Sequence, residues 1–470
     1  MQPRQPRLLN DEQMRQFITQ GYLILQTDFS EAFHRTLVEQ LNAVYEKEGN
    51  PGNNLLPRIR EMQQVFDHPT VTGALTSVLG EHYMLHAHRH GHHNASPKAG
   101  GWHKDSYWGY RKIRNHHPWW AMIMYFPQDT PVELGPTGVF PGTQNYESRV
   151  FEQEENAEEA LASGKAGTFA LIHYDIWHRS TPNVLGQHRY MLKFEFMRTE
   201  APTAPSWDNQ TPEWQAPTAL NTPIAQHADM WRETWNWLSG KVGSLADTAA
   251  ADAGRVAELA EALASDDEPA ALNAAYGLAR YGAAGVEALL SGLNQGAGRV
   301  VSRAGYGLAA AGAAAVPGLS AALASEREET VAHAVFALGE LRELASPALA
   351  KVAALMEHPA PSVRHAVVEA LSMIGVPADT ATGGLIRALQ DEDVQTRFMA
   401  GLSLARLGSA AGAAVPQLCR ALDDDNRYVR AHAAEALHYI ATPEAKDALI
   451  EYLLAARWCP TTTPESTFYP

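Results

Sequence analysis

The apolar positions in the second half of the chain follow a helical period and recur in segments that resemble one another. Each segment is followed by Gly, Pro or Asp residues and then by a second apolar helix, so the unit is a helix pair. Such pairs bury both apolar faces only by stacking on their neighbours. We therefore predict an all-α solenoid of about six helix pairs over residues 250–456. The six anchor leucines, spaced by 30 or 33 residues, are Leu278, Leu308, Leu338, Leu371, Leu404 and Leu437.

Two further features of these segments resemble HEAT repeats. A Val-Arg dipeptide stands near the start of a first helix at Val363-Arg364 and again at Val429-Arg430, and Asp-rich turns occupy 391–393 and 423–425. A HEAT-like solenoid presents an extended surface, which is acidic here. We expect this surface to face a protein partner, a second copy of the chain, or the mouth of the N-terminal domain.

The first half of the chain begins with a helix and continues mainly with strands. Asn10 is the expected N-cap, Gln13 follows three residues later, and Gly21 ends the helix before the extended segment GYLILQ. Pro and Gly turns then separate strands as far as Met197, with helices at 31–48 and 69–80. We predict a mixed domain at 1–198, a Pro- and Trp-rich linker with a junction helix at 199–249, and a tail at 457–470.

Composition narrows the class of protein. The chain has 37 Lys and Arg against 53 Asp and Glu, a net charge of −16, which disfavours nucleic acid as a partner. Only Cys419 and Cys459 occur, and the N-terminus lacks the apolar core of a secretory signal, so we expect a cytoplasmic protein. Residues 304–325 are uncharged and long enough to span a membrane, but they fall on the repeat, so we expect no membrane role.

A candidate metal site lies in the first half, which holds 15 of the 20 histidines before residue 241. His103 and Asp105 are two positions apart, so on a strand their side chains point to the same face. His178 follows 75 residues later and can supply a third ligand from a neighbouring strand. Two His and one carboxylate, with three open positions, form the facial triad that non-haem Fe(II) oxygenases use.

Two other H-x-D pairs occur in the sequence. His227 and Asp229 begin a helix, where positions i and i+2 diverge too far to share an ion. His173 and Asp175 lie too close to His178 to leave a separate distal ligand. We expect structural or supporting roles for both pairs.

The strand that follows His178 carries a candidate anion-binding residue. Apolar residues alternate along it with Arg189, Met191, Lys193 and Glu195. If the apolar face packs on helices, Arg189 points into the barrel, where a guanidinium can grip the carboxylate of an acidic cosubstrate. The alternative is an arginine in a structural ion pair.

Four segments together resemble the phytanoyl-CoA dioxygenase family: LNDEQMRQFITQGYLIL, WHKDSYW, ELGPTGVFPGTQ and DIWHRSTPN followed by HRY. The resemblance implies a double-stranded β-helix, or jelly roll, that uses Fe(II), 2-oxoglutarate and O2. It implies that His103, Asp105 and His178 bind iron, that Arg189 binds the 5-carboxylate of 2-oxoglutarate, and that Ser180 adds a hydroxyl to that contact. Thr143-Gln144 departs from the family, which often has PGSH here.

The strand MLHAHRHGHH is a second departure, because the family commonly places an amide or hydroxyl there for 2-oxoglutarate. If its histidine face points into the barrel, His88 or His90 can contact the cosubstrate or the substrate, while ordinary hydrogen-bonded histidines are the alternative. A second metal site is a further alternative. We predict a substrate pocket at Tyr107, Trp108, Met191 and Lys193.

The resemblance implies an enzyme that oxidises an unactivated C–H bond of a small organic substrate and releases succinate and CO2. Asp105 fills the carboxylate position that related halogenating enzymes leave empty, so we expect hydroxylation. Two alternatives remain. The chain is a protein hydroxylase whose solenoid selects the substrate, or it is an interaction scaffold without catalysis.

Overall fold

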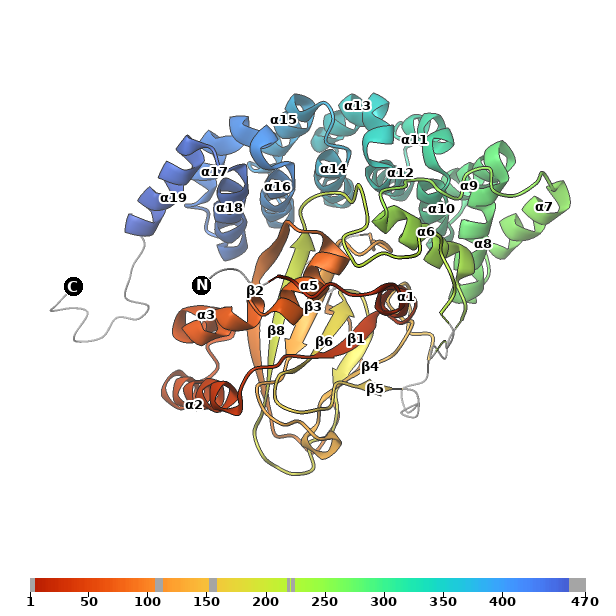
Figure 1. Ribbon diagram of the computed structural model, residues 1–470. Helices are drawn as coiled ribbons and strands as arrows, with labels where there is room; N and C mark the ends of the chain where they lie inside the picture. Colours follow the sequence, from red (N-terminus) through yellow and green to blue (C-terminus); the bar gives the residue numbers. More distant parts are fainter. Residues whose placement is uncertain (1–4, 106–112, 152–158, 218–219, 221–224, 456–470) are drawn as a thin grey trace. The chain divides into compact units, whose positions relative to one another are not determined.

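The computed structural model describes residues 5–105, 113–151, 159–217, 220 and 225–455 (Figure 1). The chain divides into two compact units, residues 1–345 and 346–470. The first unit holds every described strand and the first helices of the solenoid, and the second holds the helices that follow.

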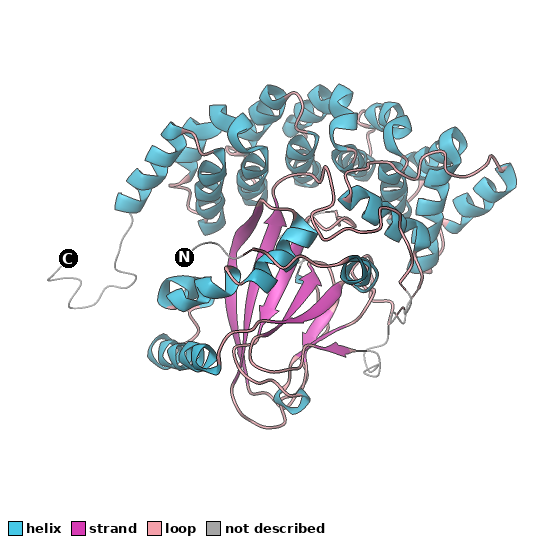
Figure 2. Cartoon of the chain, in the orientation of Figure 1, coloured by secondary structure: helices cyan, strands magenta, loops and turns pink. Residues whose placement is uncertain are grey.

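Two antiparallel sheets form the centre of the first unit (Figure 2). The larger has the strand order β1-β6-β3-β8-β2, and the smaller has the order β5-β4-β7. The predicted double-stranded β-helix is confirmed. The described strands are Tyr22–Gln26 (β1), Tyr83–Asn94 (β2), Trp120–Tyr125 (β3), Thr137–Val139 (β4), Ala160–Leu161 (β5), Thr168–His173 (β6), His178–Ser180 (β7) and Arg189–Arg198 (β8).

The first helix begins and ends where its capping residues predict. Helix α1 spans Asp11–Gln20, and Asn10 and Gln13 form a reciprocal capping box. Gly21 ends the helix at φ 77°, a left-handed conformation that favours glycine. A Cβ atom at Gly21 would lie 2.5 Å from the Gln144 side chain, whose amide donates to the Ile18 carbonyl at 3.0 Å. Gln144, where the sequence departs from the family, therefore supports the turn into β1.

Helices cover the outer face of the larger sheet, and this sets the direction of the side chains on β8. Phe66 packs edge-on against Phe194 at 4.6 Å between ring centroids, and Tyr45 packs against Tyr190 at 5.3 Å. All ten residues of β8 are buried. Because the apolar face meets helices, the face that begins at Arg189 points into the barrel, as predicted. These helices are Glu31–Glu48 (α2), Leu55–Arg58 (α3), Gln63–Phe66 (α4) and Pro69–Leu79 (α5).

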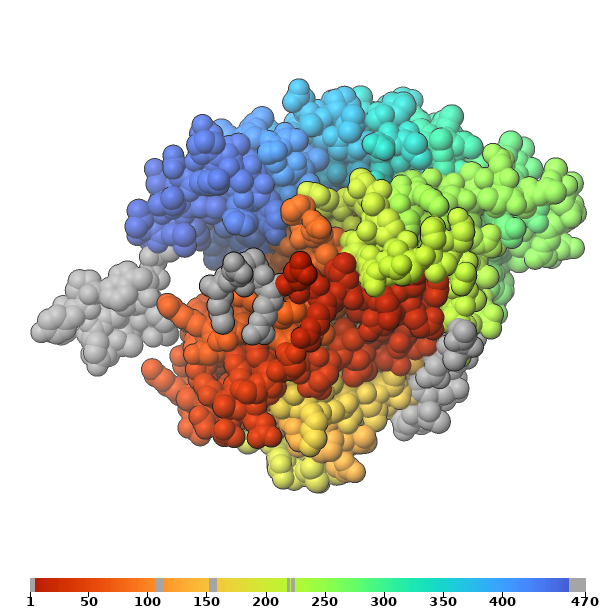
Figure 3. Space-filling model, in the orientation of Figure 1, coloured from red at the N-terminus to blue at the C-terminus, as the bar shows by residue number. Residues whose placement is uncertain are grey.

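The segment after β8 is held against α1 by hydrogen bonds to one carboxylate. Asp11 accepts from the Trp207 indole at 2.8 Å and from the Thr211 amide at 2.8 Å. Figure 3 shows this yellow-green segment packed against the red N-terminal region. It leads to helix α6 (Ala228–Leu238), whose Trp235 is fully buried under the Arg15 guanidinium.

The C-terminal helices confirm the predicted solenoid. Each anchor leucine lies in the first helix of a pair, and all six are fully buried. The helices are Ala253–Ala262 (α7), Glu268–Leu278 (α8), Gly282–Gln295 (α9), Arg299–Ala310 (α10), Val316–Ala322 (α11), Glu328–Glu340 (α12), Leu349–Ala354 (α13), Pro361–Ile374 (α14), Ala378–Ala388 (α15), Val394–Leu407 (α16), Val415–Ala421 (α17), Arg427–Ile440 (α18) and Pro443–Ala455 (α19).

Two arginines and the Asp-rich turns join successive repeats in the second unit: Arg364 of the first Val-Arg dipeptide, and Arg397, which follows Thr396. Arg364 forms a bidentate ion pair with Asp391 at 2.7 and 2.9 Å and donates to the His358 carbonyl at 2.9 Å. Arg397 repeats the arrangement one repeat later, with Asp424 at 2.9 Å. Each arginine therefore satisfies carbonyl groups of the turn before its own helix and binds the turn that follows.

One run of the described residues, Val394–Ala421, is apolar and long enough to cross a membrane by length and composition alone. It comprises α16, a 3₁₀ turn and α17, with non-helical backbone at Ala411. Of its most apolar window, 61% is buried in the protein, as expected for helices in a packed core.

A buried polar network joins the barrel to the first solenoid helices within the first unit. The His117 ring donates to Glu233 of α6 at 2.6 Å and to Glu340 of α12, and it stacks on Trp237 at 4.4 Å between ring centroids. Asn115 also donates to Glu340, at 2.6 Å. Burial lowers the pKa of His117, but the two carboxylates outweigh burial and raise the pKa to about 10.

We predict that the stabilisation of the first unit by this network decreases as the pH becomes alkaline. A pKa raised from about 6.5 in the unfolded chain to about 10 in the folded chain gives stabilisation that is complete below pH 6.5 and declines as pH rises to 10. The difference in free energy of unfolding between the wild type and His117→Gln, measured by denaturant titration from pH 6 to pH 10.5, should fall over that range. The exposed His82, changed to Gln, is the control, and a pH-independent difference for His117→Gln contradicts the prediction.

Candidate metal centre and cosubstrate cavity

Backbone pairing sets two of the predicted metal ligands opposite each other. His103 forms an isolated antiparallel bridge with His178, the first residue of β7, through two backbone hydrogen bonds of 3.0 Å. Their ring centroids lie 4.4 Å apart. The Nδ1 of His103 donates to the Gly101 carbonyl at 2.9 Å, and that of His178 donates to the Ile176 carbonyl at 3.1 Å. These bonds use both Nδ1 atoms and leave the two Nε2 atoms as the candidate metal ligands.

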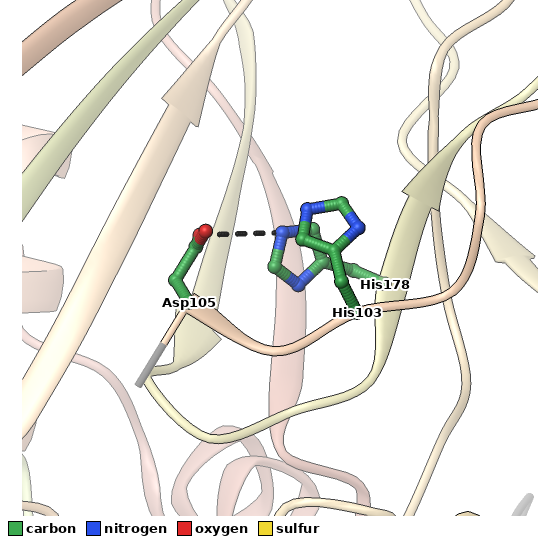
Figure 4. A group of neighbouring side chains, drawn as sticks. All are labelled: His103, Asp105 and His178. Atoms are coloured by element: carbon green, nitrogen blue, oxygen red, sulfur yellow. Dashed lines mark ion pairs between the residues drawn. The ribbon is translucent and has the colours of Figure 1, made fainter. Parts of the chain in front are cut away.

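Asp105 completes the cluster from the turn that follows His103. One ligand atom from each of the three residues lies within 4.8 Å of the others, and Figure 4 shows the side chains converging. Lys104, between the two ligands, points away and donates to the carbonyls of Thr143 and Tyr146 at 3.1 and 2.6 Å. The H-x-D spacing thus places both ligands on one side, although Asp105 lies in a turn and not on a regular strand.

The Asp105 carboxylate is ionised and lacks a complete set of hydrogen-bond partners. Burial raises its pKa, but the charges of His178 and Lys193 outweigh burial and hold the pKa well below the usual range. The His178 Nε2 lies 3.3 Å and the Lys193 Nζ 3.1 Å from Asp105 Oδ2. That buried oxygen has no partner with hydrogen-bond geometry in the described part of the chain. An unsatisfied carboxylate oxygen beside two imidazole nitrogens fits a divalent transition metal such as Fe(II).

Arg189 lines the same cavity as the metal cluster. The cavity measures about 250 Å³, and among its lining residues are His103, His178, Ser180 and Arg189. Arg189 is 1% exposed, and its Nε donates to the Gly135 carbonyl at 2.9 Å. Burial lowers its pKa to about 10. No carboxylate pairs with Arg189 among the described residues, so these residues do not form the structural ion pair that was the alternative role for Arg189.

The histidines of β2 form a row on the inner face of the barrel. His88 and His90 stack at 5.8 Å between ring centroids, and His90 and His92 lie 4.8 Å apart. Burial lowers the pKa of His88 to about 4 and that of His92 to about 3, so both rings are neutral. His92 lines the cavity, whereas His88 and His90 do not. The contact of His88 or His90 with 2-oxoglutarate stays a prediction.

The other predicted residues divide between the cavity and its surroundings. Met191 and Lys193 line the cavity together with Ser180, while Tyr107 and Trp108 lie outside the described residues. Asn94 and Thr137 also line the cavity and were missed. Asn94 pairs with Arg189 across β2 and β8, and Thr137 pairs with Ser180 across β4 and β7, so only the sheet register could have identified them.

The two other H-x-D pairs have structural partners. Asp175 forms an ion pair with Arg114 at 3.1 Å. The His227 ring hydrogen-bonds the Asn273 side chain at 2.6 Å. Among the described residues, the group of three or more possible ligands with metal-ligand geometry is His103, Asp105 and His178.

Comparison with protein families assigns both parts of the chain. Residues 7–191 match the phytanoyl-CoA dioxygenase family, and residues 316–382 and 383–458 match HEAT repeats. The chain therefore carries a phytanoyl-CoA dioxygenase domain, a member of a dioxygenase family, followed by HEAT repeats. A comparison with curated protein sequences found no match.

Solved structures similar to this chain include non-haem oxygenases. The non-haem monooxygenase ThoJ in complex with nickel is 18% identical, over 44% of this chain and 85% of its own, with a TM-score of 0.32. The α-ketoglutarate-dependent carbocyclase SnoK from nogalamycin biosynthesis is 16% identical, over 41% and 87%, with a TM-score of 0.34. HygX from Streptomyces hygroscopicus, with nickel and 2-oxoglutarate bound, is 12% identical, over 41% and 88%, with a TM-score of 0.33.

We predict that metal binding depends on Asp105 and not on Asp175. Asp105→Asn keeps the shape of the side chain and removes the anionic ligand, so Fe(II) affinity should fall at least about 100-fold, since even partners outside the ligand set cost about 10- to 100-fold. Asp175→Asn, the same change in the neighbouring H-x-D pair, should leave the affinity unchanged. Anaerobic calorimetric titration with Fe(II) measures both, and equal affinities in the wild type and Asp105→Asn contradict the assignment.

Proposed function

We propose that the chain is an Fe(II)- and 2-oxoglutarate-dependent oxygenase that hydroxylates an unactivated C–H bond of a small organic substrate. The observation that carries the proposal is a buried guanidinium without an anionic partner in the described chain, Arg189. It lines the same cavity as His103 and His178, two of the three residues with metal-ligand geometry. A buried cation of this kind is stable when an anion binds to it. A dicarboxylate can supply this anion and can also bind the metal.

The residues divide the work of binding between the two ends of the cavity. His103, Asp105 and His178 would hold iron, and Arg189 with Ser180 would hold the 5-carboxylate of 2-oxoglutarate. When bound, iron and 2-oxoglutarate supply the oxidising power of O2, with release of succinate and CO2. The protein fixes the ligands through backbone pairing and keeps the two imidazoles in one tautomer.

The walls of the cavity orient the ligands and exclude water. Met124 and Met191 contribute apolar surface between the charged groups. Asp105 would supply an anionic ligand to the metal and would so favour hydroxylation over halogenation. We place this chemistry in the predicted domain 1–198 and propose a cytoplasmic location, consistent with the scarcity of cysteine. The HEAT repeats support a protein partner or self-association as a second role of the chain.

The first experiment is an anaerobic titration of the metal-free protein with Fe(II) and 2-oxoglutarate, in the wild type and in His178→Ala. We expect the weak visible charge-transfer band of the chelate in the wild type only, because His178 is one of three ligands. The absence of the band in both folded proteins would contradict the oxygenase assignment and favour an interaction scaffold without catalysis. Given a band, succinate release that requires a peptide and not a small molecule favours a protein hydroxylase.

We further predict that Arg189 selects for the 5-carboxylate. In Arg189→Gln the Kd for 2-oxoglutarate should rise about 10- to 100-fold, the loss of a charge-assisted contact. The Kd for 2-oxobutyrate, which lacks that carboxylate, should stay unchanged and serves as the internal control. Both constants are measured on the Fe(II) protein without O2. An equal loss for the two acids would mean that Arg189 acts on the fold and not on the carboxylate.

A further inference from the structure

A second cation lines the cavity on the same strand face as Arg189. Lys193 follows four positions later on β8, so both side chains point inward, about 13 Å apart along the strand. In the ladder with β2, Arg189 is opposite Asn94, Met191 is opposite His92 and Lys193 is opposite His90. The cavity therefore has a positive group at each end of one row of residues.

The Lys193 ammonium depends on the metal site for its partner. Its side chain is 8% exposed, and its Nζ lies 3.1 Å from Asp105 Oδ2 and 3.9 Å from Glu195 Oε1. The second distance is too long for a hydrogen bond. If the Asp105 carboxylate binds a metal ion, the nearest anionic partner of Lys193 is shared with that ion. A buried ammonium without an acceptor is costly, and an anion bound next to it removes that cost.

His92 adds a polar atom between the two cations. Its Nε2 is buried and has no hydrogen-bond partner in the described chain, although the ring lines the cavity. Buried ring nitrogens are normally hydrogen-bonded, so an unpaired one in a cavity wall indicates a ligand or a water there. In the ladder His92 is opposite Met191, which lies between Arg189 and Lys193 on this face of β8.

We propose that Lys193, with His92 beside it, is a second carboxylate-binding point, at the metal end of the cavity. The inference rests on the proposed function and extends it, because it requires an acid at both ends of the cavity. Two sources have the required chemistry: the 1-carboxylate of 2-oxoglutarate and an acidic group on the substrate. Either source makes Lys193 a determinant of which acids bind.

The test compares binding constants in Lys193→Met, which removes the charge and keeps the length of the side chain. Lys165→Met is the matched control, because Lys165 is 83% exposed and pairs with Asp129 on the surface. The anaerobic Fe(II) protein is titrated with 2-oxoglutarate and 2-oxobutyrate. The protein loaded with Fe(II) and 2-oxoglutarate is then titrated with hexanoate and its neutral analogue hexanamide. If thermal melting shows that Lys193→Met does not fold, Lys193→Gln replaces it.

If the 1-carboxylate is the source, Lys193→Met weakens both oxo acids about 10- to 100-fold. If the substrate is the source, both oxo acids bind as before, and the wild type prefers hexanoate to hexanamide by a margin that the variant loses. Lys193→Arg should retain binding in either case. Unchanged oxo-acid binding without a charge-dependent preference for hexanoate overturns the inference. A wild-type protein that forms no chelate overturns the proposed function instead, so the two failures are distinct.

Discussion

Charged side chains that point into the barrel need partners there, and the arrangement of the site follows from this requirement. Arg189, Lys193 and Glu195 stand on the inner face of β8, all less than a tenth exposed. Lys193 meets Asp105, and His86 hydrogen-bonds Glu195 at 3.1 Å. Burial raises the pKa of Glu195 to about 7, which reduces its charge near neutral pH. The described protein alone offers Arg189 no anion, so the balance of charge in the barrel is completed by what binds there.

The shared side of His103 and Asp105 and the inward direction of Arg189 follow from local spacing in the sequence, while their roles in binding stay predictions. His103 and Asp105 share a face through their spacing, and Arg189 takes its direction from strict alternation along β8. The β2 histidines are harder to place, because the ladder with β8 changes register between Leu85 and Arg89. Alternation along the strand predicts that these histidines share one face. It does not predict which of them reaches the cavity.

The helix repeats are also predictable from the sequence, since six leucines at regular spacing are all buried. The boundary between the compact units is not. Composition changes near residue 240, whereas the first unit extends to residue 345. Within the first unit, Glu340 accepts hydrogen bonds from Asn115, His117 and Trp119 of the barrel. Glu340 lies more than 200 residues from these partners in the sequence, so no local sequence pattern predicts the pairing.

The repeats on the two sides of this boundary differ in how freely their number can change. In the second unit, Arg364 and Arg397 bind only the turns of adjacent repeats. Inserting or removing one such repeat leaves every remaining bond of this type in place, because each repeat supplies both halves of the pattern. Glu340 and Tyr276, by contrast, bind the barrel itself. The number of repeats in the second unit can therefore change without loss of these bonds, whereas the repeats that carry Tyr276 and Glu340 are bound to the barrel.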